Sequence, residues 1–271
     1  MNIIIPASNE AALIGVCLRA ILASENAPIL RVIVVANGCT DDTADVARTF
    51  TDDFENHGWT LEIIEVERGH KPGALNAGDA ACGPGIRMYL DADVVINPAL
   101  IRDISNILTA KTPLYASGSV KIPQPRHFVS RAYARIYAQV PFMTTGVPGC
   151  GLFAVNEAGR ARWQHFPDII ADDTFVRLSF APSERKCVAA TYLWPVVEGW
   201  SALLRVRRRQ NAGVSEIASL FPALLANDDK PSFGKGKAAR LALQDPVGFA
   251  IYAAIGLLSR GAKDTNWSRG R

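Results

Sequence analysis

Two aspartates stand at the end of an apolar run. In RMYLDADVVINP, residues 87–98, Asp91 and Asp93 directly follow the strand-like pair Tyr89 and Leu90. Ionised carboxylates avoid the interior of a buried strand, so this pair needs a reason to be there. With the two-residue period of a strand, both side chains point to one side. Two hard oxygen donors suit Mg²⁺ or Mn²⁺, and substrate phosphates can complete the coordination shell of the ion. Taken alone, the pattern also fits an exposed turn.

A second acidic pair lies further along the chain. DIIADDTFVRLSF places Asp172 and Asp173 between two apolar runs. Adjacent acids at the start of a helix can cap its N-terminus, and equally one of the carboxylates can act as a general base. The residues by themselves favour neither role.

A short basic segment is the third candidate. LLRVRRRQNAG includes Arg205, Arg207, Arg208 and Arg209. Such runs are usually a solvated helix face. Two functional interpretations compete with that one, namely a clamp on a leaving diphosphate and a contact with anionic lipid headgroups.

The first hundred residues, which must position the first aspartate pair, alternate between strand-like and helix-like segments. Strand patterns at NIIIPA, LRVIVVAN, TLEIIEVE and RMYLDAD are separated by helix-like patterns, of which KPGALNAGDAAC is one. Such alternation implies crossover units and a mostly parallel sheet. In open sheets of this kind, ligands collect outside the carboxyl ends of the strands, where PASNE, ANGCTDDT and LDADV lie.

The second half of the chain has a less regular pattern. It includes a strand at LYASGSVKIP, a helix from about Phe128 to Gln139, and a further strand at KCVAATYLWPVV. The glycine-rich stretch GVPGCGLFAVN fits a tight loop before a strand. The apolar run Val247–Leu258 is too short to span a bilayer as a helix. A docked core helix is the favoured interpretation of this run, with a membrane-surface anchor as the alternative.

Composition, charge and cysteines narrow the class of protein. About half of the 271 residues are apolar and the formal net charge is +3, which is typical of a globular chain and argues against a nucleic-acid-binding tail. Five scattered cysteines without a CxxC pair fit reduced thiols better than a disulfide framework or a zinc site. NIIIPA already has the pattern of a strand, so we expect no signal peptide. We therefore expect a cytoplasmic protein that binds no nucleic acid.

Four motifs resemble those of the family 2 glycosyltransferases of the GT-A fold, in the same order and at similar spacing. They are PASNE (residues 6–10), VVANGCTDDTADVA (34–47), KPGALNAG (71–78) and LDADV (90–94), and GCGLFAVN and ADDTFVR extend the likeness to about two-thirds of the chain. The resemblance implies an α/β fold with a Rossmann-like, mostly parallel central sheet flanked by helices, a smaller mixed sheet on the acceptor side, and C-terminal helices.

The same resemblance divides the chain into three parts. Residues 1–98 would form the nucleotide-sugar-binding half and residues 99–200 the half that binds the acceptor and holds the catalytic base. Residues 201–271 would form a basic and apolar helical segment, available for a membrane-surface or dimer contact.

The resemblance implies a nucleotide-sugar donor and a divalent cation, Mn²⁺ or Mg²⁺. Departure of a nucleoside diphosphate builds negative charge on phosphate oxygens, which such an ion stabilises. Asp93 would hold the metal, and Asp91 would lie by the ribose or the metal. The residues implied for the nucleotide-sugar site are Pro6, Ala7, Glu10, Asn37, Lys71, Asp91, Ala92 and Arg209.

One position departs from the family pattern. Many members have Asp-Asp where this chain has Ala36 and Asn37, and the second aspartate usually accepts a hydrogen bond from a uracil N–H. Asn37 can still accept through its amide oxygen, but it brings no charge and can also donate. UDP remains the first choice of nucleotide.

The resemblance also assigns the acceptor side. ADDTFVR is similar to the family's Glu-Asp motif, whose second acid is the base, and this maps to Asp173 with Asp172 in place of the glutamate. With the other motifs, it favours catalysis over capping. It further implies an acceptor-side loop at Gly149, Cys150 and Gly151, for which a plain turn is the alternative. We discount the cysteine as a nucleophile because no histidine partner is indicated.

The Gln-x-x-Arg-Trp motif of processive members is incomplete here. Val206 stands at the Gln position, Arg209 at the Arg and Gln210 at the Trp, so an aromatic platform for a growing polymer is missing. We expect metal-dependent, inverting transfer of one sugar from a UDP-sugar to a hydroxyl of a glycan or lipid-linked acceptor, in cell-envelope or exopolysaccharide synthesis. The basic run, the apolar C-terminal stretch and Trp267 would allow a peripheral contact with the inner face of the cytoplasmic membrane.

Two other functions are alternatives. A non-catalytic sugar-nucleotide or glycan binding module would keep the fold without turnover, and the intact pairs Asp91/Asp93 and Asp172/Asp173 argue against it. A sugar nucleotidyltransferase would normally have a glycine-rich phosphate loop with basic residues after the first strand, where this chain has PASNEAALIG.

Overall fold

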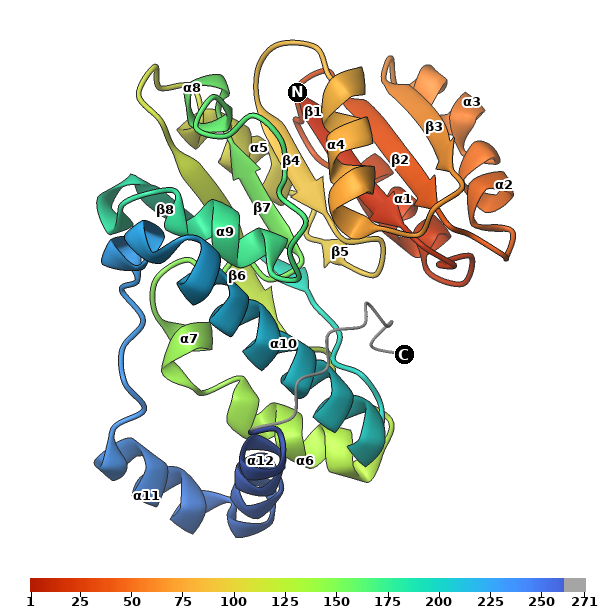
Figure 1. Cartoon of the computed structure of the whole chain (residues 1–271). Coiled ribbons are helices and arrows are strands. Elements are labelled where there is room, and N and C mark those ends of the chain that lie inside the picture. The colour runs from red at the N-terminus through yellow and green to blue at the C-terminus, as the bar shows by residue number, and fades with distance from the viewer. Residues whose placement is uncertain (261–271) are drawn as a thin grey trace.

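The computed structural model describes residues 1–260 as an α/β fold on one eight-stranded sheet, with the spatial order β3-β2-β1-β4-β7-β6-β8-β5 (Figure 1). The strands are β1 (Asn2–Ala7), β2 (Arg31–Asn37), β3 (Thr60–Val66), β4 (Arg87–Leu90), β5 (Val95–Ile96), β6 (Tyr115–Lys121), β7 (Leu152–Val155) and β8 (Arg185–Leu193). The helices of the first half are α1 (Ile14–Leu22), α2 (Thr43–Arg48), α3 (Thr51–Asn56), α4 (Lys71–Ala81) and α5 (Leu100–Ile107). Those of the second half are α6 (Phe128–Tyr137), α7 (Pro141–Thr144), α8 (Glu157–Arg160), α9 (Asp172–Leu178), α10 (Trp200–Leu220), α11 (Lys235–Gln244) and α12 (Pro246–Leu258).

The parallel half of the sheet confirms the alternation seen in the sequence. β1 pairs in parallel with β2 and β4, and β2 with β3. Ile3 and Ile5 pack in the cluster that contains the apolar residues of α1, whereas Ile4 packs with Leu75 of α4. A strand covered by helices on both faces is apolar throughout, which explains the unbroken isoleucine run.

Gly78 sets the distance between α4 and the sheet. A Cβ atom at this position would lie 2.5 Å from Cγ2 of Ile4. The helix begins at Lys71, and its N-cap is His70, whose Nδ1 accepts a hydrogen bond from the backbone N–H of Gly73 at 3.1 Å. Close packing therefore holds the first residue of α4 beside the carboxyl end of β1.

The mixed strands of the second half continue the same sheet. β7 runs antiparallel to β4, with Arg87 opposite Val155 and Leu90 opposite Leu152, and it also pairs with β6. The expectation of a separate, smaller acceptor-side sheet was wrong for the described part of the chain. The reason is that β4 and β7 are matched along their whole length and nearly every residue in them is buried, so the pairing leaves no break between two sheets.

The C-terminal helices gather at one end of the molecule. α12 packs against α6, α10 and α11, at the lower end in Figure 1, whereas β2 and β3 lie at the upper right. The apolar run predicted as a helix is α12. Within residues 1–260, no helix has both the length and the hydropathy needed to cross a bilayer. The predicted part 201–271 extends past the described residues, and Trp267 lies outside them.

We predict that Gly78→Ala destabilises the protein by about 1–3 kcal/mol, because the added methyl group must displace Ile4 in a packed interior. Gly236→Ala in α11 is the matched control, since nothing lies within 4 Å of a Cβ there. The control should gain up to about 1 kcal/mol from helix propensity. Urea unfolding of both variants measures the difference, and equal free energies of unfolding would contradict the packing role of Gly78.

Candidate functional site

The carboxyl ends of β1 and β4 meet the first residues of α4 and α9 at one pocket. Its free space is small, about 10 Å³, which is close to the volume that one water needs. Pro6, Lys71 and Asp91 of the predicted donor site line it, together with Gly151 of the predicted acceptor loop and with both acids of the predicted base motif. Asp93, the predicted metal ligand, is not among the lining residues. The lining residues are Pro6, Lys71, Leu75, Tyr89, Leu90, Asp91, Gly151, Phe153, Asp172 and Asp173.

Lys71 joins the two acidic motifs. Its Nζ lies 3.0 Å from Oδ1 of Asp91 and 3.2 Å from Oδ2 of Asp172. The side chain of Asp172 is only 6% exposed, whereas those of Lys71 and Asp91 are 28% and 33% exposed. One ammonium group therefore connects an open carboxylate to a buried one, 81 residues apart in the sequence.

Three carboxylates and one ammonium group line the pocket. Burial raises the pKa of Asp172 to about 6, against the opposing effect of Lys71 and with a further increase from Asp173 and Asp91. Burial alone would lower the pKa of Lys71, but Asp172, Asp91 and Asp173 together raise it above its usual value. The lysine therefore stays charged, and the clustered carboxylates favour cations at this place.

Asp91 and Asp93 belong to a turn. β4 ends at Leu90, and the backbone N–H of Val94 donates to the carbonyl of Asp91 at 3.1 Å. The two-residue period of a strand is therefore not what brings the two aspartates together. Ala92 is buried, 3% exposed, while both aspartates are half-buried. The turn exposes two hard oxygen donors from positions on either side of Ala92.

The oxygen ligands of this turn fit a divalent cation whose coordination shell is completed by a substrate. Among residues 1–260, no group of three His, Cys, Asp or Glu side chains is arranged to hold a metal ion. Mg²⁺ and Mn²⁺ commonly bind one or two carboxylates and take their other ligands from substrate phosphates and water. Asp91 and Asp93 match that requirement in residue type and exposure.

Asn37 forms hydrogen bonds that connect the end of β1 to the residue before α4. This residue is 1% exposed, its Nδ2 donates to the carbonyl of Ala7 at 2.9 Å, and its Oδ1 accepts from the backbone N–H of His70 at 3.1 Å. Ala7 is fully buried, and Pro6 lines the pocket. The backbone N–H of Glu10 donates to Oγ1 of Thr43, 2.7 Å away. Asn37 therefore positions the loop before α4, and its amide oxygen faces a protein partner rather than open space.

The two aspartates predicted to include the base occupy the first turn of α9. Ala171 is the N-cap, so Asp172 and Asp173 are the first two helical residues and not the cap itself. Asp173 is half-buried, and its Oδ1 accepts from the backbone N–H of Thr174 at 2.6 Å. Of the two acids, Asp173 is the more accessible from the pocket, while Asp172 is held by Lys71.

The glycine-rich loop is shaped by what lies behind it. Gly149 and Gly151 both have φ +67°. A Cβ atom on Gly149 would lie 1.7 Å from Oη of Tyr115, and one on Gly151 would lie 2.6 Å from Cδ1 of Trp194. The backbone N–H of Asp91 donates to the carbonyl of Gly151 at 2.8 Å. Burial raises the pKa of the Cys150 thiol, which keeps it protonated and unsuited to nucleophilic attack.

Two residues that the sequence analysis did not select connect α4 to the loop that leads into α9. Asn76 accepts from the backbone N–H of Phe166 at 2.7 Å and donates to its carbonyl at 3.0 Å. His70 Nε2 lies 2.6 Å from Oδ1 of Asp168. Asn76 belongs to the motif KPGALNAG that begins at Lys71, so the sequence did contain a signal for it.

α10 supports the same loop from the other side. A Cβ atom on Gly213 would lie 2.8 Å from Cβ of Ala171, and Oε2 of Glu216 accepts from the backbone N–H of Ile170 at 2.7 Å. Arg209 is one helical turn before Gly213 and so is on the same face of α10. This places the arginine on the side of the helix that meets the acidic motif.

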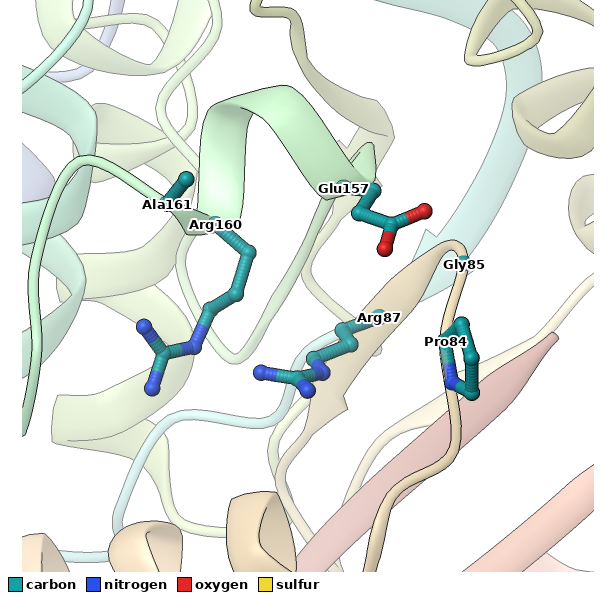
Figure 2. Close-up of a pocket in the computed structure, with 6 residues that line it drawn as sticks. All are labelled: Pro84, Gly85, Arg87, Glu157, Arg160 and Ala161. Atoms are coloured by element: carbon teal, nitrogen blue, oxygen red, sulfur yellow. The ribbon is translucent and has the colours of Figure 1, made fainter.

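A larger cavity, about 250 Å³, lies at the start of β4, away from this chemistry. Figure 2 shows the guanidinium groups of Arg87 and Arg160 near each other in it, and both are held by the buried carboxylate of Asp79, at 3.2 and 2.8 Å. These ion pairs are structural. The residues lining this cavity are Pro84, Gly85, Arg87, Glu157, Arg160 and Ala161.

We predict a pH-dependent stability difference between the wild-type protein and Asp172→Asn. The pKa of Asp172 rises from 3.8 to about 6 on folding, so its contribution to stability is present below pH 4 and is lost as the pH rises through 6. Relative to the variant, the wild type should lose about 2–3 kcal/mol between pH 4 and pH 7. Urea unfolding at several pH values without divalent metal tests this. A difference in the free energy of unfolding between the two proteins that stays constant with pH would contradict it.

Comparison with known proteins identifies the family. Residues 1–147 match the family model described as "Glycosyltransferase like family 2". The 4,4'-diaponeurosporenoate glycosyltransferase of Staphylococcus aureus is 29% identical over 173 residues, which is 61% of this chain. The chain spans 42% of the length of that relative.

Solved structures share the fold. The mannosyltransferase PcManGT of Pyrobaculum calidifontis, in complex with GDP-Man and Mn²⁺, aligns with a TM-score of 0.61 at 23% identity, over 96% of this chain and 75% of its own. Glucosyl-3-phosphoglycerate synthase of Mycobacterium tuberculosis, in complex with Mn²⁺ and UDP, aligns with a TM-score of 0.55 at 18% identity, over 86% and 81%. Because the family model covers more than half of the chain and its neighbours have the same α/β architecture, this protein belongs to glycosyltransferase family 2, with a GT-A-like fold.

Proposed function

We propose that the chain transfers one sugar from a nucleoside diphosphate sugar to an acceptor hydroxyl, with inversion and with the help of Mn²⁺ or Mg²⁺. The observation that carries this proposal is the pocket in which Lys71 contacts both Asp91 and Asp172. It joins a carboxylate turn suited to a metal diphosphate with a second acidic pair suited to base catalysis. Such a pocket could both stabilise the departing diphosphate and deprotonate the acceptor hydroxyl.

On the donor side, Asp93 and Asp91 would hold the cation, which when bound neutralises charge on the departing diphosphate. Lys71 lies at the N-terminus of α4, where its charge and the helix dipole both favour phosphate. In the described conformation, its ammonium is taken by two carboxylates. Donor binding would therefore replace a carboxylate contact of Lys71 by a phosphate contact. Arg209, on the face of α10 that meets Ala171, would add a second basic group.

On the acceptor side, Asp173 would take the proton of the attacking hydroxyl. The acceptor oxygen then bonds to the anomeric carbon while the bond from that carbon to the diphosphate breaks on the opposite face, which inverts the configuration. Asp172 is buried and paired with Lys71, so it would orient the site rather than accept the proton. Gly149 to Gly151 would border the acceptor, because Gly151 lines the pocket beside Asp91.

The nucleotide is the less determined part of the donor. The two solved neighbours hold GDP-Man and UDP, respectively. UDP remains our first choice, but the amide oxygen of Asn37 is occupied by His70, so the base must be recognised mainly by other groups. For the acceptor, we propose a hydroxyl of a glycan or lipid-linked molecule in cell-envelope or exopolysaccharide synthesis, with one sugar added per encounter. A cytoplasmic location also stays a prediction.

We predict that Asp93→Ala abolishes metal-dependent binding of the nucleotide, whereas Asp173→Asn keeps it and lowers transfer at least about a hundredfold. Asp52→Asn, an exposed acid of α3, is the control that should leave both unchanged. Calorimetric titration and a turnover assay separate the two roles. Equal loss of nucleotide binding in both site variants would contradict them, and intact binding without any wild-type turnover would favour a non-catalytic module.

We predict further that one nucleoside diphosphate raises the melting temperature only when Mn²⁺ is present, because a ligand of the folded state stabilises it by mass action. The panel is UDP, GDP, CDP, TDP and ADP, each with and without metal. A shift with UDP would support the first choice, and a shift with another base would replace it. A shift that is the same with chelator would contradict the role of the carboxylate turn.

A further inference from the structure

The outer face of α12 is apolar, and no segment of residues 1–260 covers it. The helix sequence PVGFAIYAAIGLL contains no charged residue. Gly248 and Ile255 are buried toward the body of the protein, and a Cβ atom on Gly248 would lie 3.0 Å from the carbonyl of Ala132 in α6. Away from these contacts, Val247, Leu257 and Leu258 are 51%, 62% and 53% exposed.

That face departs from the usual pattern of a surface helix. Helices at a protein surface normally place polar side chains on the side away from the core, and helices that are apolar all round are normally buried. Here Val247, Ala250, Ala254, Leu257 and Leu258 follow helical spacing along one side. A continuous apolar strip of this kind indicates a contact surface for a partner outside residues 1–260.

The neighbouring helix α11 adds positive charge beside this strip. Leu241 of α11 is buried, and Leu243 is 85% exposed. Lys235, Lys237 and Arg240 are exposed on the same helix. Between positions 230 and 260 there are five basic residues and one acidic residue, in a chain whose formal net charge is only +3. The positive excess of the protein is thus concentrated at the end that also exposes leucines.

The one acidic residue of this segment does not offset that charge. Asp245 lies 2.6 Å from Nε of Arg135 in α6, and it caps α12 by accepting from the backbone N–H of Gly248 at 2.9 Å. Its carboxylate is thus committed to a cation and a helix end inside the fold. The lysines of α11 face outward, where an anionic surface can reach them.

We propose that the outer face of α11 and α12 binds the surface of an anionic phospholipid bilayer. Exposed leucine and valine side chains would enter the headgroup region, and Lys235, Lys237 and Arg240 would contact lipid phosphates. A second copy of the chain fits less well, because a two-fold contact would oppose the same basic residues. In Figure 1 this face is at the lower end, so a bilayer there leaves β1–β3 uncovered.

The test is co-sedimentation of the purified full chain with vesicles of phosphatidylglycerol and phosphatidylcholine, against phosphatidylcholine alone. We expect binding to the anionic vesicles at low salt and weaker binding at 0.5 M salt, where the screening length is about 4 Å. Reversing three charges, in Lys235→Glu/Lys237→Glu/Arg240→Glu, should lower the partition coefficient at least about a hundredfold. Leu243→Ser/Leu257→Ser/Leu258→Ser should also lose binding.

Matched controls use exposed residues elsewhere. Ile29→Ser replaces an apolar residue that is 78% exposed, and Lys111→Glu/Lys186→Glu reverses two exposed charges away from the C-terminal helices. All variants should keep the wild-type melting temperature and its response to nucleotide. A failure of membrane binding can then be distinguished from a failure of the proposed sugar transfer. Three results would overturn the proposal: no binding to anionic vesicles, equal binding by the α11–α12 variants, or a dimer that the leucine variant dissociates.

Discussion

The ammonium group of Lys71 is the interaction on which the arrangement of the site depends. It lies between a carboxylate of the turn after β4 and a carboxylate at the start of α9, and Asp172 is buried with it as its partner. A buried carboxylate without such a partner is costly, so the bridge also holds α9 against the sheet. Gly78 allows α4 to approach β1, and the His70 cap fixes where α4 begins. The position of the Lys71 charge thus follows from close packing about two turns further along the same helix.

The loop before α9 is held from two directions, and this explains how an irregular segment can position an acid. Asn76 and His70 attach it to α4 through Phe166 and Asp168. Glu216 attaches it to α10. The helix that contacts the start of α9, α10, also packs on α12, so the pocket and the basic, apolar end of the molecule share α10 as a common support.

The sequence predicted the parallel half of the fold well, because the isoleucine run of β1 and the alternation of strands and helices have direct local signals. It brought Lys71, Asp91, Asp172 and Asp173 into one site only through a family resemblance, since no local pattern specifies contacts across 81 residues. The single sheet was missed because strand pairing is set by long-range register, which short strands such as β7 do not reveal. The inward hydrogen bonds of Asn37 and the support from Glu216 were likewise invisible, since both depend on partners chosen by the tertiary fold.

The central position of β7 has a consequence for how the chain can fold. β4 is paired with β1 on one side, and its other side is completed only by residues 152–155, more than sixty positions later in the sequence. Until those residues are available, β4 is an open edge of buried, apolar residues, and such edges invite pairing with other chains. Contacts between distant segments also slow folding. The motifs predicted to bind the donor all precede residue 98, yet the sheet that presents them is completed by a strand from the second half of the chain. We therefore expect the two halves to fold as one cooperative unit.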